Sequence, residues 1–478
     1  MVSPRIEFLS KDEIYKIHIT SLNILEKIGI KVMDENILNL LKNSGCEIDY
    51  ENKIAKIPQY LVMECIKKIP KNFTIYARNN KYNITFGNGK MKFISSGGQM
   101  NIVDPISKNR RPGKLQDTIN AVKLGYSLEN INIVGAMVVP QDVPLELADI
   151  YMYSILLKYS SKVIFAWIYN RKSAEYILKM LSILAGGIEE LKKEPLTFYF
   201  CEPTSPLKFG ENALQVLHLF TKIGMPVCFG PMVMASATGP ATLAGTLSME
   251  NAEILAGTVI SQLIYPGVPV LYGGIPHILD QKTGNISFGS PEQGIMAAAI
   301  TQIGKYYGFP IHVNIGLTDS KLPDAQSGIE KASTMLMGAL AGAELSGHLG
   351  ISGADMGACF EQLVIDNEIA DYIQRIIKGF EINDETLALE ISEKVGVGGT
   401  FLTQKHTLKY IRSEFWYPKI FDRKDWNSWY NLGAKDSIKI ANEIVSKILK
   451  EYQIEILDKD IEKEIDEIIL KAKKEILK

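Results

Sequence analysis

Between about Met91 and Gly379, stretches of strand-like composition alternate eight times with stretches of helical periodicity. The predicted strands are 92–96, 131–139, 163–168, 196–201, 227–233, 269–273, 311–317 and 344–351. The predicted helices are 115–127, 145–160, 172–186, 211–224, 248–265, 291–308, 328–342 and 360–378. Such repetition predicts a parallel sheet with helical crossovers. Eight repeats are the number that closes a (β/α)8 TIM barrel, a fold of typically about 250 residues, and this is the fold class that we predict.

An open, doubly wound α/β sheet is the alternative arrangement of the same elements. The common dinucleotide-binding version of that fold has a G-x-G-x-x-G motif at the start of a βα unit. The sequence has no such motif at any of the predicted units, which favours the barrel.

The segments on either side of the barrel have a different pattern. Helices are predicted over 11–28, 34–43 and 58–68, strands over 73–77 and 82–86, and a tight hairpin at Asn88-Gly89. A capped helix through Val395 and a charged helical tail over 435–478 follow the barrel. We therefore predict an N-terminal α+β cap (1–90), the barrel (91–380) and a C-terminal helical extension (381–478).

Charge and composition exclude several functions. The net charge of −2 gives no basis for steering the protein to nucleic acid, and no apolar run has the length that a membrane span needs. The start of the chain, MVSPRIEFLSKDE, lacks the apolar segment of a signal peptide. The five cysteines form no C-x-x-C pair, which favours reduced, buried thiols. We expect a cytoplasmic protein that binds neither membranes nor nucleic acid.

Candidate site residues follow the predicted strands, because the chemistry of a TIM barrel lies at the carboxyl ends of its strands. These residues are Gln99, Trp167, Tyr169, Glu202, Tyr272, His277, Asn314, Asp319 and His348. The aromatic and acidic members suit a cation site, since ring faces attract ammonium groups by roughly 0.5–2 kcal/mol per contact. Gln99, Asn314 or His348 could donate to a substrate carboxylate. For any single residue, barrel packing or helix capping is an equally good explanation.

If the ring of Tyr272 forms one wall of the cation site, its replacement by alanine should weaken binding and hardly change the melting temperature.

A metal site is a second interpretation of the same residues. His277, His348 and Asp319 could bind one zinc ion in the barrel mouth, as in a metal-dependent hydrolase. The sequence contains no H-x-H and no H-E-x-x-H pair, so we predict no bound metal.

Several longer motifs resemble those of one known family. They are 236–273, which begins with the small-residue stretch SATGPATLAG, Gly316–Lys331, Phe360–Asp366, Asn383–Thr386, Gly396–Phe401 and His406–Leu408. From about residue 95 to 440, and more faintly in the cap, the chain is similar to the trimethylamine methyltransferase superfamily. This resemblance implies a (β/α)8 barrel that transfers a substrate methyl group to Co(I) of a separate corrinoid protein.

Founding members of that superfamily carry pyrrolysine in the barrel mouth, whereas this chain contains only standard residues. The pyrrolysine-free branches demethylate quaternary amines such as glycine betaine, proline betaine, carnitine and γ-butyrobetaine, and the resemblance places the chain there. It implies that the chain binds no cofactor tightly, that a cognate corrinoid protein carries the cobalamin, and that the small residues Gly239, Pro240, Gly245 and Gly284 face this macrocycle. We also expect a homo-oligomer.

Three alternatives stay open: a trimethylamine-type methyltransferase, the metal-dependent hydrolase, and a betaine sensor or scaffold without activity.

Overall fold

The computed structural model describes residues 4–454 and 457–477. Residues 1–3 of the stretch inspected for a signal peptide, and residues 455, 456 and 478 of the predicted tail, lie outside the described residues.

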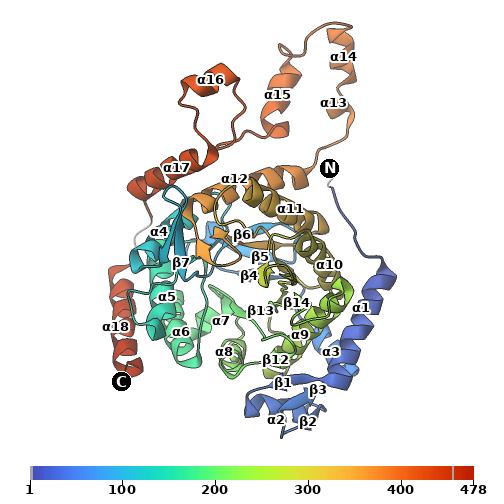
Figure 1. Ribbon diagram of the computed structural model, residues 1–478, viewed down its shortest axis with the longest axis vertical. Coiled ribbons are helices and arrows are strands. Elements are labelled where there is room, and N and C mark those ends of the chain that lie inside the picture. Colours follow the sequence, from blue (N-terminus) through green and yellow to red (C-terminus); the bar gives the residue numbers. More distant parts are fainter. Residues whose placement is uncertain (1–3, 455–456, 478) are drawn as a thin grey trace.

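Eight short parallel strands form the centre of the molecule, and helices surround them (Figure 1). The strands are β6 (Lys92–Ser95), β9 (Ile133–Gly135), β10 (Val163–Phe165), β11 (Tyr199–Cys201), β13 (Val227–Phe229), β15 (Val270–Tyr272), β18 (His312–Asn314) and β19 (Leu345–Leu349). Hydrogen-bonded ladders give the orders β10-β9-β6-β19-β18 and β11-β13-β15. A parallel bridge between Tyr272 and Ile311 connects the two ladders. Between β10 and β11, the Thr197 hydroxyl donates to the Ile164 carbonyl at 2.8 Å. The predicted (β/α)8 barrel is confirmed.

The helices that alternate with these strands lie close to their predicted positions. They are α4 (Leu115–Ser127), α5 (Ala148–Tyr159), α6 (Arg171–Ala185), α8 (Glu211–Lys222), α9 (Leu243–Ile264), α10 (Pro291–Tyr307), α11 (Ala325–Ala341) and α12 (Phe360–Lys378). A short extra helix, α7 (Ile188–Lys193), follows α6. The start of α9 differs from the prediction, because the helix already includes Gly245. A Cβ on Gly245 would lie 2.8 Å from Pro240 Cβ, so this glycine permits close packing of a helical turn and does not belong to a loop.

Alternate residues of the strands face two different apolar regions. In β15, Leu271 belongs to the apolar cluster inside the barrel, whereas Val270 and Tyr272 belong to the cluster between strands and helices. The same alternation places Phe198 and Phe200 inside and Tyr199 outside. Both faces of each strand are therefore buried, as is usual for parallel sheets.

The N-terminal segment covers one side and one end of the barrel. It contains α1 (Lys11–Asn23), a π-helical turn (Ile24–Ile28), α2 (Glu35–Asn43), α3 (Gln59–Lys68), and the strands β1 (Ile30–Val32), β2 (Glu47–Asp49), β3 (Ile54–Lys56), β4 (Phe73–Ile75) and β5 (Ile84–Phe86). β1 pairs in parallel with β12 (Lys208–Phe209), which follows β11. The boundaries of the three predicted domains stay a prediction.

The β4–β5 hairpin closes the amino-terminal end of the barrel. Ile75, Ile84 and Phe86 share the interior apolar cluster with the barrel strands, and Figure 1 shows both strands within the ring of helices. The predicted hairpin turn at Asn88-Gly89 is wrong, because a 3-10 turn at Asn80–Tyr82 connects β4 to β5. Asn88 and Gly89 lead from β5 into β6, directly after Gly87, whose N–H donates to the Glu344 carboxylate at 2.6 Å.

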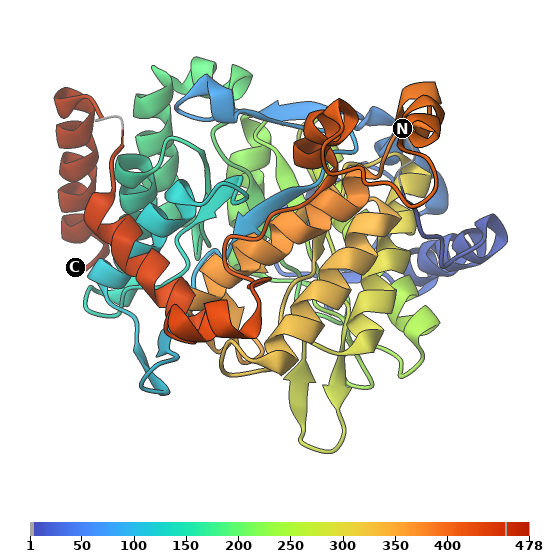
Figure 2. The ribbon, with the colours of Figure 1, turned by 90° about the horizontal axis from the view of Figure 1, so that it is seen from above.

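Smaller hairpins extend the opposite end of the barrel. Each follows the carboxyl end of a barrel strand: β7 (Asn101–Asp104) with β8 (Asn109–Pro112), β14 (Met234–Ala235) with β16 (His277–Asp280) and β17 (Asn285–Ser287), and β20 (Ile351–Ser352) with β21 (Gly357–Ala358). Figure 2 shows the β7–β8 and β16–β17 hairpins projecting from one end of the molecule.

The C-terminal region consists of a projecting part and two packed helices. Residues 380–434, which we call the arm, contain α13 (Asp384–Leu387), α14 (Leu389–Val395), α15 (Lys405–Glu414) and α16 (Trp426–Asn431). The predicted helix through Val395 is divided at Ala388, which has a left-handed backbone with φ of 55°. α17 (Ser437–Glu451) packs on α12 and α4, and α18 (Lys459–Ile476) packs on α6. Within the described ranges, no helix is long and apolar enough to cross a membrane.

A buried ion pair connects the last two barrel units. Lys331 Nζ lies 2.9 Å from Asp366 Oδ2, and both side chains are fully buried. Lys331 also donates to the Gly316 carbonyl at 2.9 Å, and Asp366 accepts from the Gly350 N–H at 2.8 Å. The pair thereby fixes the chain just after β18 and just after β19.

Lys331→Met should lower the free energy of unfolding by about 3–5 kcal/mol, because it leaves the Asp366 carboxylate buried without its partner. The matched control is Lys56→Met, which removes a partly exposed pair with Glu47 and should cost no more than about 1 kcal/mol. Urea denaturation followed by circular dichroism measures both changes. Equal losses for the two variants would contradict the role assigned to the buried pair.

Candidate active site

Buried acidic side chains on the helices hold the loops that follow the strands. In α9, Glu250 accepts from the N–H groups of Val233 (3.1 Å) and Ile275 (2.8 Å), which follow β13 and β15. Glu253, one helical turn further, accepts from the Leu207 N–H and the Ser205 hydroxyl, both at 2.7 Å. Burial raises the pKa of Glu253 to about 7 and that of Glu250 well above its usual range. One helix thus positions three of the loops.

Helix carboxylates accept hydrogen bonds from loops in other units of the barrel as well. Asp149 of α5 accepts from the Tyr169 N–H at 3.0 Å and from the Ser173 hydroxyl at 2.5 Å. Glu330 of α11 accepts from the Asp319 N–H at 2.9 Å and from the Thr318 hydroxyl at 2.5 Å. These loops are fixed by backbone hydrogen bonds, which leaves their other side chains free to line the mouth of the barrel.

Aromatic rings form one wall and the floor of that mouth. The Trp167 ring lies 5.5 Å from Phe200 and 5.2 Å from His348, measured between ring centroids. The indole N–H of Trp167 donates to the Gly98 carbonyl at 3.1 Å, which fixes the orientation of the ring. Ring faces held in this way attract a cation without binding it through a formal charge.

Two histidines lie beneath these rings. His348 and His312 are buried with their ring centroids 5.7 Å apart. Burial lowers the pKa of His348 to about 4, and burial together with the nearby His348 lowers the pKa of His312 well below its usual range. Neither ring nitrogen of His348 has a hydrogen-bond partner among the described residues. Both imidazoles are therefore neutral at pH 7. The Ser95 backbone lies close enough to the His348 ring to raise its pKa against the effect of burial, although neither ring nitrogen makes a hydrogen bond of ordinary geometry.

Two carboxyl groups meet at the rim. Glu202 lines a hollow of about 550 Å³ together with Trp167, Tyr169 and Phe200. Glu202 and Asp355 are both exposed to solvent at the rim, and the protein that surrounds them limits the hydration of their carboxyl groups. Burial and the charge of Asp355 raise the pKa of Glu202 to about 7, and burial raises the pKa of Asp355 to about 6. Asp355 accepts from the Gln99 side-chain amide at 2.7 Å.

The structure thus brings together four of the predicted site residues, Gln99, Trp167, Glu202 and His348, with Tyr169 at the outer edge of the hollow. Asn314 ends β18 with a buried side chain, and its Oδ1 atom has no partner among the described residues.

Tyr272 does not lie in the mouth. The strand alternation turns its ring outward, where it contacts Phe309 and Tyr307 at 5.5 and 6.2 Å between centroids. Its hydroxyl donates to Asn251 of α9 at 2.7 Å, and the residue is fully buried. The expectation that Tyr272 forms one wall of the cation site is therefore not supported by its position.

His277 and Asp319 form a separate group. His277 Nδ1 lies 2.7 Å from the Ile275 carbonyl, and Asp319 accepts from the Ser287 hydroxyl (2.5 Å) and the Phe288 N–H (2.7 Å). The ring neighbours of His348 are the aromatic and imidazole rings of the mouth. Across the part of the chain that the structure describes, no three His, Cys, Asp or Glu side chains converge as a metal site would require. The geometry gives the zinc hydrolase alternative no support.

The small residues that were expected to face a macrocycle lie in different settings. Gly284 is at the turn of the β16–β17 hairpin, where an added Cβ would meet nothing within 4 Å. Pro240 is exposed just before α9, but an added Cβ on Gly239 would lie 2.5 Å from Val233 Cγ1. Gly284 and Pro240 are accessible, whereas Gly239 and Gly245 serve local packing.

Three mouth residues were not predicted from the sequence: Phe200, His312 and Asp355. Phe200 and His312 lie within strands, where successive side chains face the barrel interior and the helices in turn. If one residue of each strand is known to face the interior, this alternation identifies both of them. Asp355 lies six residues beyond β19, in the turn between β20 and β21, so a search restricted to strand ends excludes it.

Tyr272→Ala should lower the free energy of unfolding by about 3–5 kcal/mol, since it empties a large, fully buried site. Tyr272→Phe keeps the ring and should cost only about 1 kcal/mol, for the lost hydrogen bond to Asn251. Thermal and urea denaturation measure both. An unchanged melting temperature for Tyr272→Ala, combined with weaker binding of a quaternary amine, would instead return Tyr272 to the site.

Comparison with known proteins identifies the family. The family model described as trimethylamine methyltransferase (MTTB) matches residues 2–477. The trimethylamine methyltransferase MttB of Desulfitobacterium hafniense (strain DSM 10664 / DCB-2) is 34% identical over 452 residues, covering 95% of this chain and 91% of the relative. The glycine betaine methyltransferase of Desulfitobacterium hafniense (strain Y51) is 34% identical over 478 residues, covering 99% and 98%.

Solved structures support the fold. The monomethylamine methyltransferase MtmB of Methanosarcina barkeri matches with a TM-score of 0.51 at 11% identity, over 92% of this chain and 93% of that one. A hydroxylamine complex of MtmB matches with a TM-score of 0.55, also at 11% identity, over 94% and 90%. These likenesses concern the fold alone. The full-length match to the family model and the two relatives at 34% identity show that this chain is a methyltransferase and belongs to the trimethylamine methyltransferase (MTTB) family.

Proposed function

We propose that the protein transfers a methyl group from a quaternary amine to Co(I) of a corrinoid carried by a separate protein. The observation that carries this proposal is the mouth itself, where Trp167 and Phe200 present ring faces beside the carboxyl group of Glu202. Rings and carboxyl groups are the partners that a permanent cation requires. The candidate substrates are glycine betaine, proline betaine, carnitine and γ-butyrobetaine.

The reaction needs little acid–base chemistry from the protein. A quaternary amine leaves with both electrons of the C–N bond and becomes a neutral tertiary amine, while the acceptor supplies the pair for the new bond. No proton is transferred, which agrees with a mouth whose two histidines are neutral and buried. The contribution of the protein is to orient one methyl group toward the opening and to exclude water, and orientation alone can contribute several kcal/mol.

The balance between rings and carboxyl groups matters because the positive charge on nitrogen disappears in the transition state. Binding that charge too strongly would stabilise the substrate more than the transition state. Trp167 supplies a cation–π attraction that is weaker than a close ion pair, and Glu202 has a pKa of about 7, so that its charge is only partly developed at neutral pH. Both features moderate ground-state binding.

The carboxylate of a betaine needs a donor at the other end of the site. The ring of His348 has only the nearby Ser95 backbone as a polar neighbour that acts on its pKa, and it lies 5.2 Å from Trp167, centroid to centroid. A neutral imidazole N–H can donate one hydrogen bond without adding a positive charge beside the ammonium group. We therefore assign recognition of the substrate carboxylate to His348, while Gln99 positions Asp355 at the rim.

The acceptor approaches from the same open end. Pro240 and Gly284 are accessible there, and the β16–β17 hairpin projects from this end (Figure 2). A bulky macrocycle requires such an unobstructed rim, with neither residue presenting a long side chain. We assign the docking of the corrinoid protein to this end of the barrel.

The proposal is tested with a panel of methylated amines and a corrinoid protein in the Co(I) state. Methylation of the corrinoid is followed by its visible spectrum, and the tertiary amine product by mass spectrometry. Turnover of a quaternary amine supports the proposal, whereas turnover of trimethylamine alone would assign the protein to the other substrate class named among its relatives. Binding of a betaine without any turnover would indicate a sensor.

Binding of a quaternary amine should strengthen by about tenfold between pH 6 and pH 8, because ionisation of Glu202 with a pKa of about 7 creates the negative charge that the cation meets. The free energy of unfolding should change in the opposite direction. Because the pKa of Glu202 is raised in the folded protein, its ionisation lowers the stability of the fold as the pH rises. Calorimetry at several pH values measures the effect.

Two controls isolate the charge of Glu202. Glu202→Gln should remove most of the pH dependence, and an uncharged analogue with a tert-butyl group in place of the trimethylammonium group should bind equally at both pH values. If Glu202→Gln keeps the full pH dependence, another group is responsible.

Trp167→Ala should weaken binding of the same amine by about 10- to 30-fold, corresponding to roughly 2 kcal/mol for a desolvated cation–π contact. Trp167→Phe keeps a ring face and should lose less. The control is Tyr50→Ala, an exposed aromatic residue of the N-terminal segment, which should not change the affinity. Equal affinities for Trp167→Ala and the unmodified protein would remove Trp167 from the site.

A further inference from the structure

The arm carries an unusual density of exposed apolar side chains. Nearly half of the large apolar residues that are exposed in the described chain lie in it. They are Phe380, Ile382, Leu387, Leu389, Val397, Phe401, Leu402, Leu408, Phe415, Tyr417, Phe421, Trp426, Tyr430 and Leu432. Leu402 is 81% exposed and Trp426 is 73% exposed. A concentration of this kind marks an interaction surface.

The arm has no core of its own. None of α13, α14, α15 and α16 contains a buried residue, and Figure 1 shows these helices projecting beyond the ring that surrounds the barrel. Ordering a residue costs roughly 1–2 kcal/mol of backbone entropy, which burial of apolar surface normally offsets. Within one chain the arm lacks that compensation, so the burial has to come from another molecule.

The root of the arm is nevertheless held firmly. Glu368 of α12 accepts from the N–H groups of Lys419 (2.7 Å) and Ile420 (2.9 Å), and Asp371 accepts from the Trp416 indole N–H at 2.8 Å. The Arg375 guanidinium donates from Nε to the Glu414 carbonyl at 2.8 Å. Three side chains of one helix therefore fix where the arm returns to the barrel, and the arm presents its surface in a defined position.

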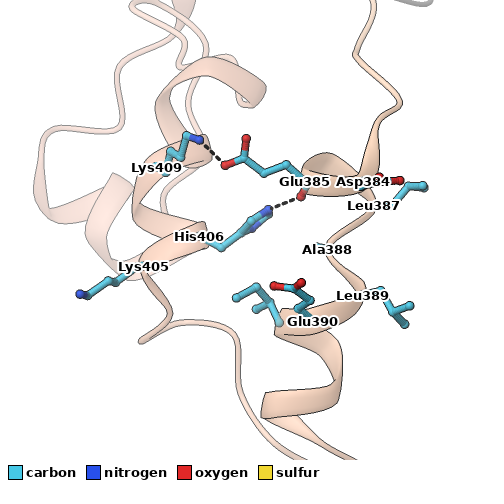
Figure 3. A pocket seen from close by; sticks show the side chains of 10 residues that line it. Asp384, Glu385, Leu387, Ala388, Leu389, Glu390, Lys405, His406 and Lys409 are labelled. Atoms are coloured by element: carbon cyan, nitrogen blue, oxygen red, sulfur yellow. Dashed lines mark hydrogen bonds and ion pairs between the residues drawn. The ribbon is translucent and has the colours of Figure 1, made fainter.

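The outer part of the arm keeps its shape by polar contacts. Figure 3 shows His406 and Lys409 of α15 turned toward Glu385, across a hollow of about 750 Å³. His406 Nε2 lies 3.0 Å from the Glu385 carbonyl, and Lys409 pairs with the Glu385 carboxylate. Leu387 and Leu389 point away from α15 and leave their apolar surface unpaired (Figure 3).

An apolar hollow lies beside the root. It has a volume of about 550 Å³ and is lined by α11, α12, the start of α17 and Phe421, with Ala332, Ile365, Ile369 and Tyr372 among its residues. One face of the molecule thus carries both a projecting apolar arm and an apolar hollow. A surface with both complementary parts is what a two-fold symmetric contact between identical chains requires.

Charge and area also favour an identical chain. Residues 380–434 contain eight acidic and seven basic side chains, so the arm offers no strong charge to a partner of opposite sign. If each exposed apolar side chain of the arm leaves about 100 Å² accessible, the set exceeds the roughly 800 Å² per partner that a stable interface buries. The area is sufficient for a permanent dimer.

We propose that the arm docks on a second copy of this chain, placing its apolar side chains over the hollow beside the partner's α11 and α12, while the partner's arm does the same in return. The contact is reciprocal. It also supplies the burial that orders the arm.

Sedimentation velocity of the full chain tests this proposal without any substrate, so its outcome is independent of the methyl-transfer assay. The unmodified protein should sediment as a dimer or a larger even-numbered assembly at micromolar concentration. The arm variant Leu402→Glu/Trp426→Glu and the hollow variant Ala332→Arg should each raise the dissociation constant at least 100-fold and give monomers. The control Leu470→Glu alters a residue of α18 that is 59% exposed and should leave the mass unchanged.

Circular dichroism checks that the variants keep their helical content. Hydrogen exchange should show arm amides protected in the unmodified protein and unprotected in both dissociating variants. A monomeric unmodified protein, or an assembly that neither variant dissociates, would overturn the proposal. Loss of corrinoid-protein binding in the arm variant at unchanged mass would also overturn it and assign the arm to that partner.

Discussion

The hydrogen bonds between buried helix carboxylates and loop N–H groups determine the geometry of the open end of this barrel. Glu250 and Glu253 hold three loops from a single helix, the buried Asp149 and Asp366 hold two others, and Glu330, which is half-buried, holds a further one. A carboxyl group buried without such partners would cost several kcal/mol. Each loop therefore has one favoured position. The rings and carboxyl groups of the mouth are positioned by these loops and need no hydrogen bonds to one another.

The order of elements could be predicted from the sequence because helices such as α6, α8 and α12 have an apolar and a polar face, and the strands are short apolar runs. The helices α5 and α9 are buried nearly all round and were recognised by their length. The direction of a side chain could not be predicted in the same way. In Val270-Leu271-Tyr272 all three residues are apolar or aromatic, so nothing in the pattern tells which face meets the barrel interior. Tyr272 was consequently predicted to lie in the mouth, although it packs against Asn251 of α9 and Tyr307 of α10.

Site residues were predicted correctly where they directly follow a strand. They were missed where a residue further along the chain folds back to the rim of the barrel. Trp167 and Glu202 belong to the first kind. Asp355 belongs to the second, because a small hairpin carries it back toward Gln99. His277 and Asp319 also follow strands, but their hydrogen bonds serve the local loops. Position just after a strand is therefore not sufficient to place a residue in the mouth, and it is not necessary either, because Phe200, His312 and His348 lie within strands.

The β4–β5 hairpin, which closes the amino-terminal end of the barrel, has a consequence for the order of events in catalysis. Among the described residues, this hairpin fills the amino-terminal end of the barrel with apolar side chains, which closes the direct route through the centre from that end. If the protein has the proposed function, the amine and the methyl acceptor must then both approach through the open end of the barrel. The amine has to enter before the acceptor covers it, and the demethylated product has to wait until the acceptor departs. A closed barrel end thus imposes a compulsory sequence of binding and release.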